Sequence, residues 1–413
     1  MAVLHLPDSD TALRRPALST HLQQRIATEF ESRLRDEWGG KFVTHGRPTR
    51  SDDVRLDGND YLSITGRPEI VQSQLGAIKS DQEFVVQSGV FQLEGNAAWK
   101  LERALCEWIG VEDGLLCQSG YTANLGLLQV IADAQTPVYI DSLAHMSLWE
   151  GARAARAPVH PFRHNDPQHL AKMIERHGAG LVVVDSVYST TGALCPLLKI
   201  VEAAERSASM ILVDESHSLG TRGPAGAGLC AQLGLSRRVH FITASLAKAF
   251  AGRAGFFSMP RALRNYLMCH SFPTIFSSCL LPHDIAGLRA TLEVIKRSDS
   301  ARRELTANTR RLRSSLAALG YPIHQGSQQI ISLEAGAEFD TLALRDELES
   351  RGVIGAVFCA PATSRNRAMV RLTLNAGLTD AELGLVECAA AAVATRVRPW
   401  DWPIARRSRA LYA

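Results

Sequence analysis

The sequence lacks any long uninterrupted apolar run. No stretch of its 413 residues reaches the ~18 consecutive apolar positions that a membrane-spanning helix needs. The first residues also lack the apolar segment of a secretory signal, because Asp8, Asp10, Arg14 and Arg15 interrupt their short apolar patches. We therefore expect a cytoplasmic protein without a membrane span.

An excess of charge of either sign is also missing. Lys and Arg total 45 against 42 Asp and Glu, which gives a net charge of +3 at pH 7. This balance offers no global electrostatic attraction for nucleic acid or for an anionic membrane. The composition, with 46% hydrophobic and 21% charged residues, is that of an ordinary globular protein with room for two or three domains.

Paired cysteine motifs are absent as well. The eight cysteines are scattered without a C-x-x-C pair, and most lie in apolar stretches. We expect buried free thiols and a reducing compartment. His160, His164 and His169 have a loosely ligand-like spacing, but no cysteine or carboxylate framework accompanies them, so we predict no metal site.

The sequence does contain an alternation of short apolar runs and helical segments between about residues 54 and 290. The runs are apolar throughout rather than at every second residue, which indicates burial on both faces, as in a parallel sheet covered by helices. Helical patterns at 122–133 and 197–207 separate some of the runs, so we predict an open α/β domain. The predicted strands are 114–117, 137–140, 181–184, 211–213 and 240–242.

The flanking regions have a different character. Residues 21–38 carry apolar residues at helical spacing, which predicts one amphipathic helix in an N-terminal segment of residues 1–54. After the large domain, 55–290, an Arg-rich helical pattern at 298–319 and apolar runs at 329–333 and 369–374 predict a smaller α+β domain over 291–398. A solvated or partner-docked tail, 399–413, completes the predicted organisation.

Polar residues follow five of the apolar runs at the point where each predicted strand ends. In open α/β sheets, ligands bind beyond the carboxyl ends of the strands. We therefore expect one edge of the sheet to be lined by Ser119, Asp141, Asp185, Asp214 and Ser245.

Lys248 and Asp214 indicate the chemistry at this edge. Lys248 lies in an almost uncharged stretch, and an ammonium in apolar surroundings has a lowered pKa and a more nucleophilic amine. A carboxylate about 4 Å from a pyridine nitrogen contributes roughly 4 kcal/mol towards keeping that nitrogen protonated. A Schiff-base lysine, an aspartate for the ring nitrogen, and a hydroxyl such as Ser245 for the phosphate are what pyridoxal 5′-phosphate (PLP) requires.

Two nearby segments are compatible with the same cofactor. Ser119, Gly120 and Tyr121 follow a strand and open a helix, where backbone N–H groups suit a phosphate, although an ordinary turn with a serine N-cap has the same pattern. His145 follows the strand that ends at Asp141 and is either a stacking partner for a flat ring or a buried core histidine. The glycine-rich segment 223–228 follows no strand of a first βαβ unit, so we do not interpret it as a dinucleotide-binding loop.

Taken together, these motifs resemble those of the α-oxoamine synthases. These are fold-type I PLP enzymes that condense an amino-acid-derived carbanion with an acyl-CoA. Within the family the sequence is most similar to the quorum-sensing autoinducer synthases. The resemblance covers about residues 55–390 and is most specific at 139–153, 184–190, 213–221, 243–248, 361–364 and 370–372.

The resemblance implies a fold and a role for each matching residue. The fold would be α/β, a fold-type I PLP-dependent transferase with a mostly parallel large sheet and a smaller C-terminal α+β domain. The active site would be shared across a homodimer, with Ser277 and Ser278 completing the partner's phosphate site. The implied roles are Lys248 as the Schiff-base lysine, Asp214 at the pyridine nitrogen, His217 and Ser189 at the 3-oxygen, His145 on the ring, Ser119, Gly120, Tyr121 and Ser245 at the phosphate, and Asn59 and Arg371 at the amino substrate.

The resemblance also implies a reaction. An acyl-CoA of medium chain length would acylate an amino substrate, S-adenosylmethionine or a related 2-aminobutyrate source, with Lys248 moving the α-proton and His145 or His217 donating to the oxyanion. Ala247, Ala249 and Ala251 replace glycines that many relatives carry around the lysine, and Ser216 replaces a common alanine. The alternatives are a biosynthetic synthase making 8-amino-7-oxononanoate, 2-amino-3-oxobutyrate or 5-aminolevulinate, an aminotransferase, and a ligand-sensing module of the same fold.

Overall fold

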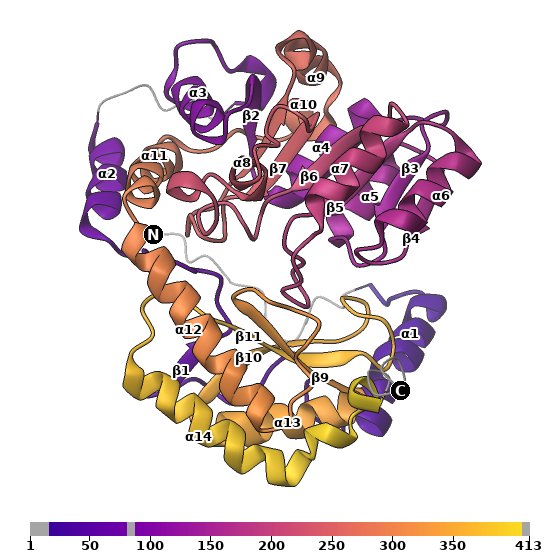
Figure 1. Cartoon of the computed structure of the whole chain (residues 1–413), viewed down its shortest axis with the longest axis vertical. Coiled ribbons are helices and arrows are strands. Elements are labelled where there is room, and N and C mark those ends of the chain that lie inside the picture. The colour runs from indigo at the N-terminus through magenta and orange to yellow at the C-terminus, as the bar shows by residue number, and fades with distance from the viewer. Residues whose placement is uncertain (1–15, 81–86, 407–413) are drawn as a thin grey trace, which may run out of the picture.

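The structure is a computed structural model of the chain that describes residues 16–80 and 87–406. Two β-sheets organise these residues into a large and a small layer of α/β structure (Figure 1). The seven-stranded sheet has the order β2-β8-β7-β6-β5-β3-β4, and only β8 runs antiparallel to its neighbours. Its strands are β2 Asp113–Cys117, β3 Val138–Asp141, β4 Val159–Phe162, β5 Leu181–Asp185, β6 Met210–Asp214, β7 Phe241–Ser245 and β8 Gly255–Met259.

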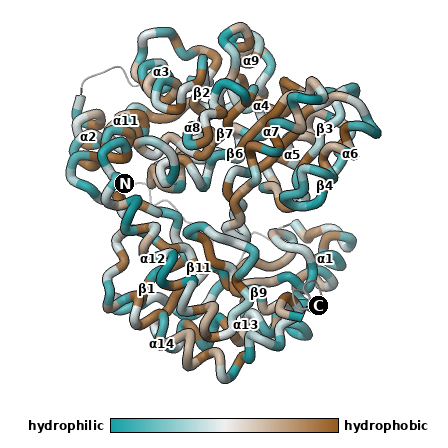
Figure 2. The backbone as a smooth tube through the Cα atoms, viewed as in Figure 1, coloured by the Kyte–Doolittle hydropathy of each residue, from teal (hydrophilic) through white to brown (hydrophobic). Residues whose placement is uncertain are grey.

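The large sheet is covered by helices on both faces. Alternate residues of one strand face opposite sides: Leu181 and Val183 pack with α4 and α5, whereas Val182 and Val184 pack with α6 and α7. This explains why the strands are apolar at every position, and Figure 2 shows hydrophobic residues concentrated along them. The helices of this domain are α2 Pro68–Lys79, α3 Ala97–Ile109, α4 Gly120–Ile131, α5 Met146–Ala154, α6 Pro167–His177, α7 Leu197–Arg206, α8 Leu229–Gln232, α9 Arg264–His270, α10 Phe272–Phe276 and α11 Pro282–Lys296.

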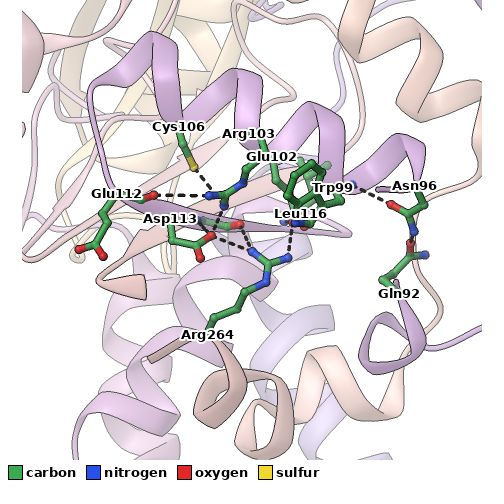
Figure 3. A network of polar contacts seen from close by, with 11 residues as sticks. Gln92, Asn96, Trp99, Glu102, Arg103, Cys106, Glu112, Asp113, Leu116 and Arg264 are labelled. Carbon is green, nitrogen blue, oxygen red and sulfur yellow. Dashed lines mark hydrogen bonds and ion pairs between the residues drawn. The ribbon is translucent and has the colours of Figure 1, made fainter. Parts of the chain in front are cut away.

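A buried ion-pair network holds α3 and the edge strand β2 together (Figure 3). Arg264 donates to Glu102 Oε2 at 2.6 Å and to Asp113 Oδ1 at 2.7 Å, and Arg103 also pairs with Asp113. The other oxygen of Glu102 accepts the backbone N–H of Leu116 at 3.0 Å. These contacts fix the end of β2, from which the chain enters α4.

The small sheet contains strands from both ends of the chain. Its order is β1-β10-β11-β9, with β1 Val54–Leu56 parallel to β10 Val353–Phe358, which is antiparallel to β11 Ala368–Thr373. The fourth strand is β9 Ile330–Gly336. The sheet packs with α12 Asp299–Ala318, α13 Glu338–Ser350 and α14 Asp380–Val397.

The N-terminal segment docks on this smaller layer. Helix α1 Thr20–Ile26 continues through wider turns to Glu37, and Trp38 donates to Glu338 Oε2 at 2.6 Å. This confirms the helix predicted over 21–38. Because β1 belongs to the small sheet, residues at the start of the predicted large domain lie with the C-terminal layer instead; the limits 55–290 and 291–398 remain a prediction. Residues 1–15 and 407–413 lie outside the described part of the chain.

Two expectations about composition are resolved by the structure. All eight cysteines are free, and five of them are buried, whereas Cys269 and Cys388 are exposed and Cys279 is half-buried. Among residues 16–80 and 87–406, no helix has the length and apolarity needed to cross a bilayer.

Candidate active site

The polar residues expected at one edge of the large sheet do lie there. Asp141, Asp185, Asp214 and Ser245 are the last residues of β3, β5, β6 and β7, which run parallel to one another. Ser119 follows β2, which runs in the same direction because β8 is antiparallel to both of its neighbours. The carboxyl ends of these strands face the small sheet.

A cavity of about 630 Å³ lies at this edge, between the two sheets. Its lining includes the apolar side chains of Met146, Trp149 and Phe358 and polar residues from both layers. Six of the residues predicted from the sequence line it, namely Asn59, His145, Ser189, His217, Lys248 and Arg371.

Lys248 lies on the turn that follows β7. Its neighbours Ala249 and Phe250 are buried, and its own pKa is lowered, mainly by burial and further by the charge of Arg371, while Asp214 acts in the opposite direction. The turn is closed by a hydrogen bond from the N–H of Ala251 to Lys248 O at 2.8 Å. Ala251 has a φ of 49°, a left-handed conformation that glycine adopts without strain.

Asp214 is buried at the end of β6 and held in place from two sides. The N–H of Ser216 donates to Oδ1 at 2.8 Å, and Asn124 of α4 donates to Oδ2 at 2.7 Å. The same Asn124 amide donates to Ser147 Oγ at 2.9 Å. Neither donor neutralises the aspartate, so a fixed negative charge remains available to a cationic ring nitrogen.

His145 is joined to this network through Ser147. It is the N-cap of α5: its Nδ1 accepts the backbone N–H of Ser147 at 3.2 Å and lies 2.7 Å from Ser147 Oγ. Burial lowers the pKa of His145, which favours the neutral imidazole. Because Nδ1 accepts a backbone hydrogen bond, the proton of the neutral ring is on Nε2.

His217 is buried between the layers, with only 5% of its surface exposed. Its Nδ1 lies 2.5 Å from the hydroxyl of Tyr61, and its carbonyl accepts a hydrogen bond from Gln329 Nε2 at 2.8 Å. Burial lowers the pKa of His217 well below its usual value and raises the pKa of the Tyr61 hydroxyl. Both groups therefore remain neutral near pH 7.

Arg371 is a buried guanidinium without a carboxylate partner among the described residues. It donates to Ser189 O at 3.0 Å and to Asn59 Oδ1 at 3.2 Å, and its carbon lies 4.5 Å from the centre of the Phe358 ring. Its Nε is buried and has no hydrogen-bond partner. Burial lowers the pKa of Arg371, so an anion in the cavity would satisfy a free donor and balance a charge that is costly to bury.

The start of α4 forms a close-packed cradle against the end of β7. Ser119 is the N-cap and forms a capping box with Thr122. A Cβ at Gly120 would lie 2.5 Å from the Cβ of Ser245, so only glycine lets these two segments approach this closely. The six predicted phosphate-site residues, Ser119, Gly120, Tyr121, Ser245, Ser277 and Ser278, are not among those that line the cavity itself.

The segment after α10 lies beside this cradle within the same chain. Gln118 donates to the carbonyl of Ser278, and Ser88 forms a β-bridge with Ser278. That Ser277 and Ser278 complete the phosphate site of the partner subunit remains a prediction. An amine, a fixed carboxylate, two neutral imidazoles and a glycine-opened helix start fit PLP, and the cofactor predicted from the sequence is therefore consistent with the chemistry of this edge.

Three polar residues of the site were not assigned a role from the sequence. Asn124, Ser147 and Tyr61 are 1%, 0% and 0% exposed, and each holds one of the predicted groups in place. Ser147 lies in the stretch 139–153 that carries the family resemblance, Asn124 in the predicted helix 122–133, and Tyr61 two residues after Asn59. A polar residue at a buried position of a helix was the signal that could have identified Asn124.

Comparison with known proteins identifies relatives over most of the chain. The family model for aminotransferase class I and II matches residues 51–386. A relative described as "CAI-1 autoinducer synthase" from Vibrio campbellii is 44% identical over 91% of this chain and 95% of its own length. An "8-amino-7-oxononanoate synthase" from Anaeromyxobacter sp. (strain K) is 31% identical over 84% of this chain and 87% of its own.

A solved structure shares the fold. The structure described as "Sphingomonas wittichii Serine palmitoyltransferase" superposes with a TM-score of 0.83 at 24% identity, covering 93% of this chain and 99% of the other. At this identity the likeness speaks for the fold alone.

Proposed function

The chain belongs to the aminotransferase class I and II family as a PLP-dependent acyltransferase, and we propose that it makes the α-aminoketone precursor of a quorum-sensing signal. In this reaction the α-carbon of an amino-acid substrate, which we propose to be S-adenosylmethionine, forms a bond to the acyl carbonyl carbon while the C–S bond of the acyl-CoA breaks and CoA leaves. Loss of the substrate carboxyl group as CO2 then gives the aminoketone. The observation that carries the proposal is the Vibrio campbellii relative, which matches nearly the whole of both chains.

The first part of the mechanism is the binding of the amino substrate. Arg371 holds the substrate carboxylate, since its Nε is free and its charge is unbalanced, and Asn59 orients the guanidinium. Lys248 accepts the α-proton, and its lowered pKa favours the neutral amine that this step requires. Bound at this edge, PLP supplies the electron sink that stabilises a carbanion beside the substrate nitrogen. Asp214 keeps the ring nitrogen protonated.

The second part is attack on the acyl-CoA carbonyl. A negative charge develops on the carbonyl oxygen, and a donor placed there stabilises it. His145 carries its proton on Nε2, because its Nδ1 accepts from Ser147, and it lines the cavity. His217 is arranged in the same way if the Tyr61 hydroxyl, which retains its proton, donates to its Nδ1. The apolar side chains of the lining, among them Met146 and Trp149, accommodate the acyl chain.

A substrate series tests the proposed function. Purified PLP-loaded enzyme is incubated with S-adenosylmethionine, glycine, alanine or serine, each with acyl-CoA of several chain lengths, and products and free CoA are followed by mass spectrometry. We expect acylated product and CoA release with S-adenosylmethionine and medium-chain acyl-CoA. Turnover with glycine, alanine or serine alone would instead assign a biosynthetic synthase, and product without CoA release an aminotransferase.

We also propose a homodimer formed through the face around Ser277 and Ser278. Phe272 and Phe276 belong to α10, which directly precedes this pair, and are 56% and 76% exposed. Phe91, in a segment that contacts α10, is 62% exposed. Large exposed apolar groups that lie together indicate an interface. Phe276→Glu should lower the mass measured by light scattering to that of one chain. Phe339→Glu, at an equally exposed site on α13, serves as the control, and a dimer that tolerates both changes contradicts this interface.

A further inference from the structure

A second cavity of about 440 Å³ lies on the far side of the layer that carries His217. One wall is formed by Thr221 and Arg222 of the large domain, and the other is formed by α12 of the small domain (Figure 1). The turn 326–329 closes it. Gln329 lines this cavity and donates to the carbonyl of His217, so a single layer of residues separates the two cavities.

Three guanidinium groups line the second cavity, and no carboxylate does among the described residues. Arg222 donates only to the neutral amides of Gln232 and Gln328. Arg310 is exposed and forms neither a hydrogen bond nor an ion pair within residues 16–80 and 87–406. Glu215 influences Arg222 at a distance, but its oxygens accept from the N–H groups of other residues.

Arg313 is the most unusual of the three. Its guanidinium donates to four carbonyl oxygens, which belong to Ile323, Gly326, Gln328 and Ile330, at 2.5–3.2 Å. These bonds fix the turn but leave the positive charge without a counter-ion, and burial lowers the pKa of Arg313 to about 10. A half-buried charge that is satisfied in hydrogen bonds but unbalanced in charge favours an anion nearby.

A separate observation comes from α12. Thr309 lines the cavity, is 7% exposed, and its hydroxyl oxygen has no hydrogen-bond partner. Buried hydroxyl groups are almost always hydrogen-bonded, so an isolated one in a cavity wall indicates a missing partner. Thr306 and Ser327 add further hydroxyl groups to the lining.

We propose that this cavity is a binding site for a phosphate-bearing small molecule, separate from the active site. The free fork of Arg310 matches two phosphate oxygens, Arg222 and Arg313 supply positive charge, and the hydroxyl groups supply donors. The volume is within the range of small-molecule sites, so the phosphate belongs either to a nucleotide or to free inorganic phosphate.

Calorimetric titration of the PLP-loaded enzyme with ADP and, separately, with inorganic phosphate tests the proposal. Arg310→Gln should weaken binding at least about tenfold, which corresponds to 1.4 kcal/mol. Arg311→Gln is the matched control, because it removes the same charge from the next residue of α12, where Arg311 is already paired with Glu387 and Asp380. We expect the affinity of Arg311→Gln for each ligand to stay within about twofold of that of the unaltered enzyme, which corresponds to about 0.4 kcal/mol.

The two ligands distinguish the source of the phosphate. Binding of ADP alone assigns a nucleotide site, and equal affinity for inorganic phosphate assigns a site for the free anion. The proposal is overturned if neither ligand binds more tightly than about 1 mM, or if Arg310→Gln and Arg311→Gln weaken binding equally. Equal weakening would mean that the ligand responds to net charge or occupies the active-site cavity.

Discussion

Replacing Arg371 by lysine tests the role of the one buried guanidinium that faces the active-site cavity. In the structure this side chain has two donors in use, to Ser189 and Asn59, and a third, Nε, that is buried and unpaired. A guanidinium has five N–H donors, so each terminal nitrogen also keeps one N–H that these two bonds do not use, and a substrate carboxylate is expected to receive two charge-assisted hydrogen bonds, from Nε and one terminal nitrogen. Lysine retains the positive charge but offers no planar fork, so Arg371→Lys removes one of these bonds.

The size of the effect follows from that single lost bond. A hydrogen bond to a charged group contributes about 1.5–3 kcal/mol, so the KM for the amino substrate should rise about 10- to 150-fold. The value of kcat should change much less, because the carboxylate is bound equally in the ground state and the transition state.

Steady-state kinetics of CoA release measure both parameters. Arg367→Lys is the matched control, since Arg367 lines the same cavity but already forms two hydrogen bonds to Glu334, at 3.1 and 2.8 Å. We expect the KM of the amino substrate to be nearly unchanged in Arg367→Lys. An analogue of the substrate without its carboxylate should bind the unaltered enzyme and Arg371→Lys with equal affinity.

Two results would refute this reasoning. One is a KM in Arg371→Lys that stays within about threefold of the original, since that is below 1 kcal/mol and too small for a lost charged bond. The other is an equal loss for the analogue without a carboxylate, which would mean that Arg371 acts only by holding Ser189 and Asn59 in place.

Three further predictions concern the cofactor and His217. Lys248→Ala should abolish the visible absorption band of the lysine-bound cofactor while cofactor still co-purifies; a band that persists would exclude Lys248 as the bonded amine. Gly120→Ala should weaken the affinity for PLP, measured by equilibrium dialysis, by about 1–3 kcal/mol, because its Cβ would lie 2.5 Å from the Cβ of Ser245. Gly384→Ala is the control: its Cβ would meet nothing within 4 Å, so the affinity for PLP should be unchanged. The buried imidazole of His217 has a pKa well below 6.5, so below pH 6.5 the unfolded chain takes up a proton that the folded apoprotein does not, and stability falls as pH falls. The free energy of unfolding in urea should therefore fall less steeply with falling pH in His217→Gln than in the unaltered apoprotein, by up to about 1.4 kcal/mol per pH unit. Identical slopes of unfolding free energy against pH would contradict a buried neutral His217.

Most of the large domain could be predicted from the sequence because continuous apolar runs have one explanation in an α/β protein. Each of the five predicted strands overlaps an observed strand, and their ends agree to within one residue except that β7 extends three residues beyond the predicted 240–242. Four strands were missed: β1 is short, β4 is interrupted by a proline, and β8 and β10 each contain a glycine. Their places depend on pairing with distant strands, which sequence patterns do not specify.

The residues of the site divide in the same way. Asp214, Ser245 and Lys248 could be identified because strand ends mark them in the sequence. The pairing of Arg371 with Asn59 spans 312 residues and depends on the small layer closing over the large one. Tyr61 and Asn124 lie in motifs that attracted attention, but their roles became visible only when His217 and Asp214 were placed beside them.

The charges of the site also connect substrate binding to proton transfer. The positive charge of Arg371 is one cause of the lowered pKa values of Lys248 and His217. A bound carboxylate would cancel that charge, so the pKa of the Lys248 amine should rise when the amino substrate arrives, which is when the amine must accept a proton. Lys248 would be bonded to the cofactor in the free enzyme and released as an amine only when the amino substrate is bound, so the pKa of this amine is read from the pH profile of kcat, which describes the substrate-bound enzyme. The analogue without a carboxylate leaves the charge of Arg371 unbalanced, so the acidic pKa in its kcat profile should lie below that of the substrate; equal pKa values for the substrate and the analogue would show that the carboxylate has no part in the shift.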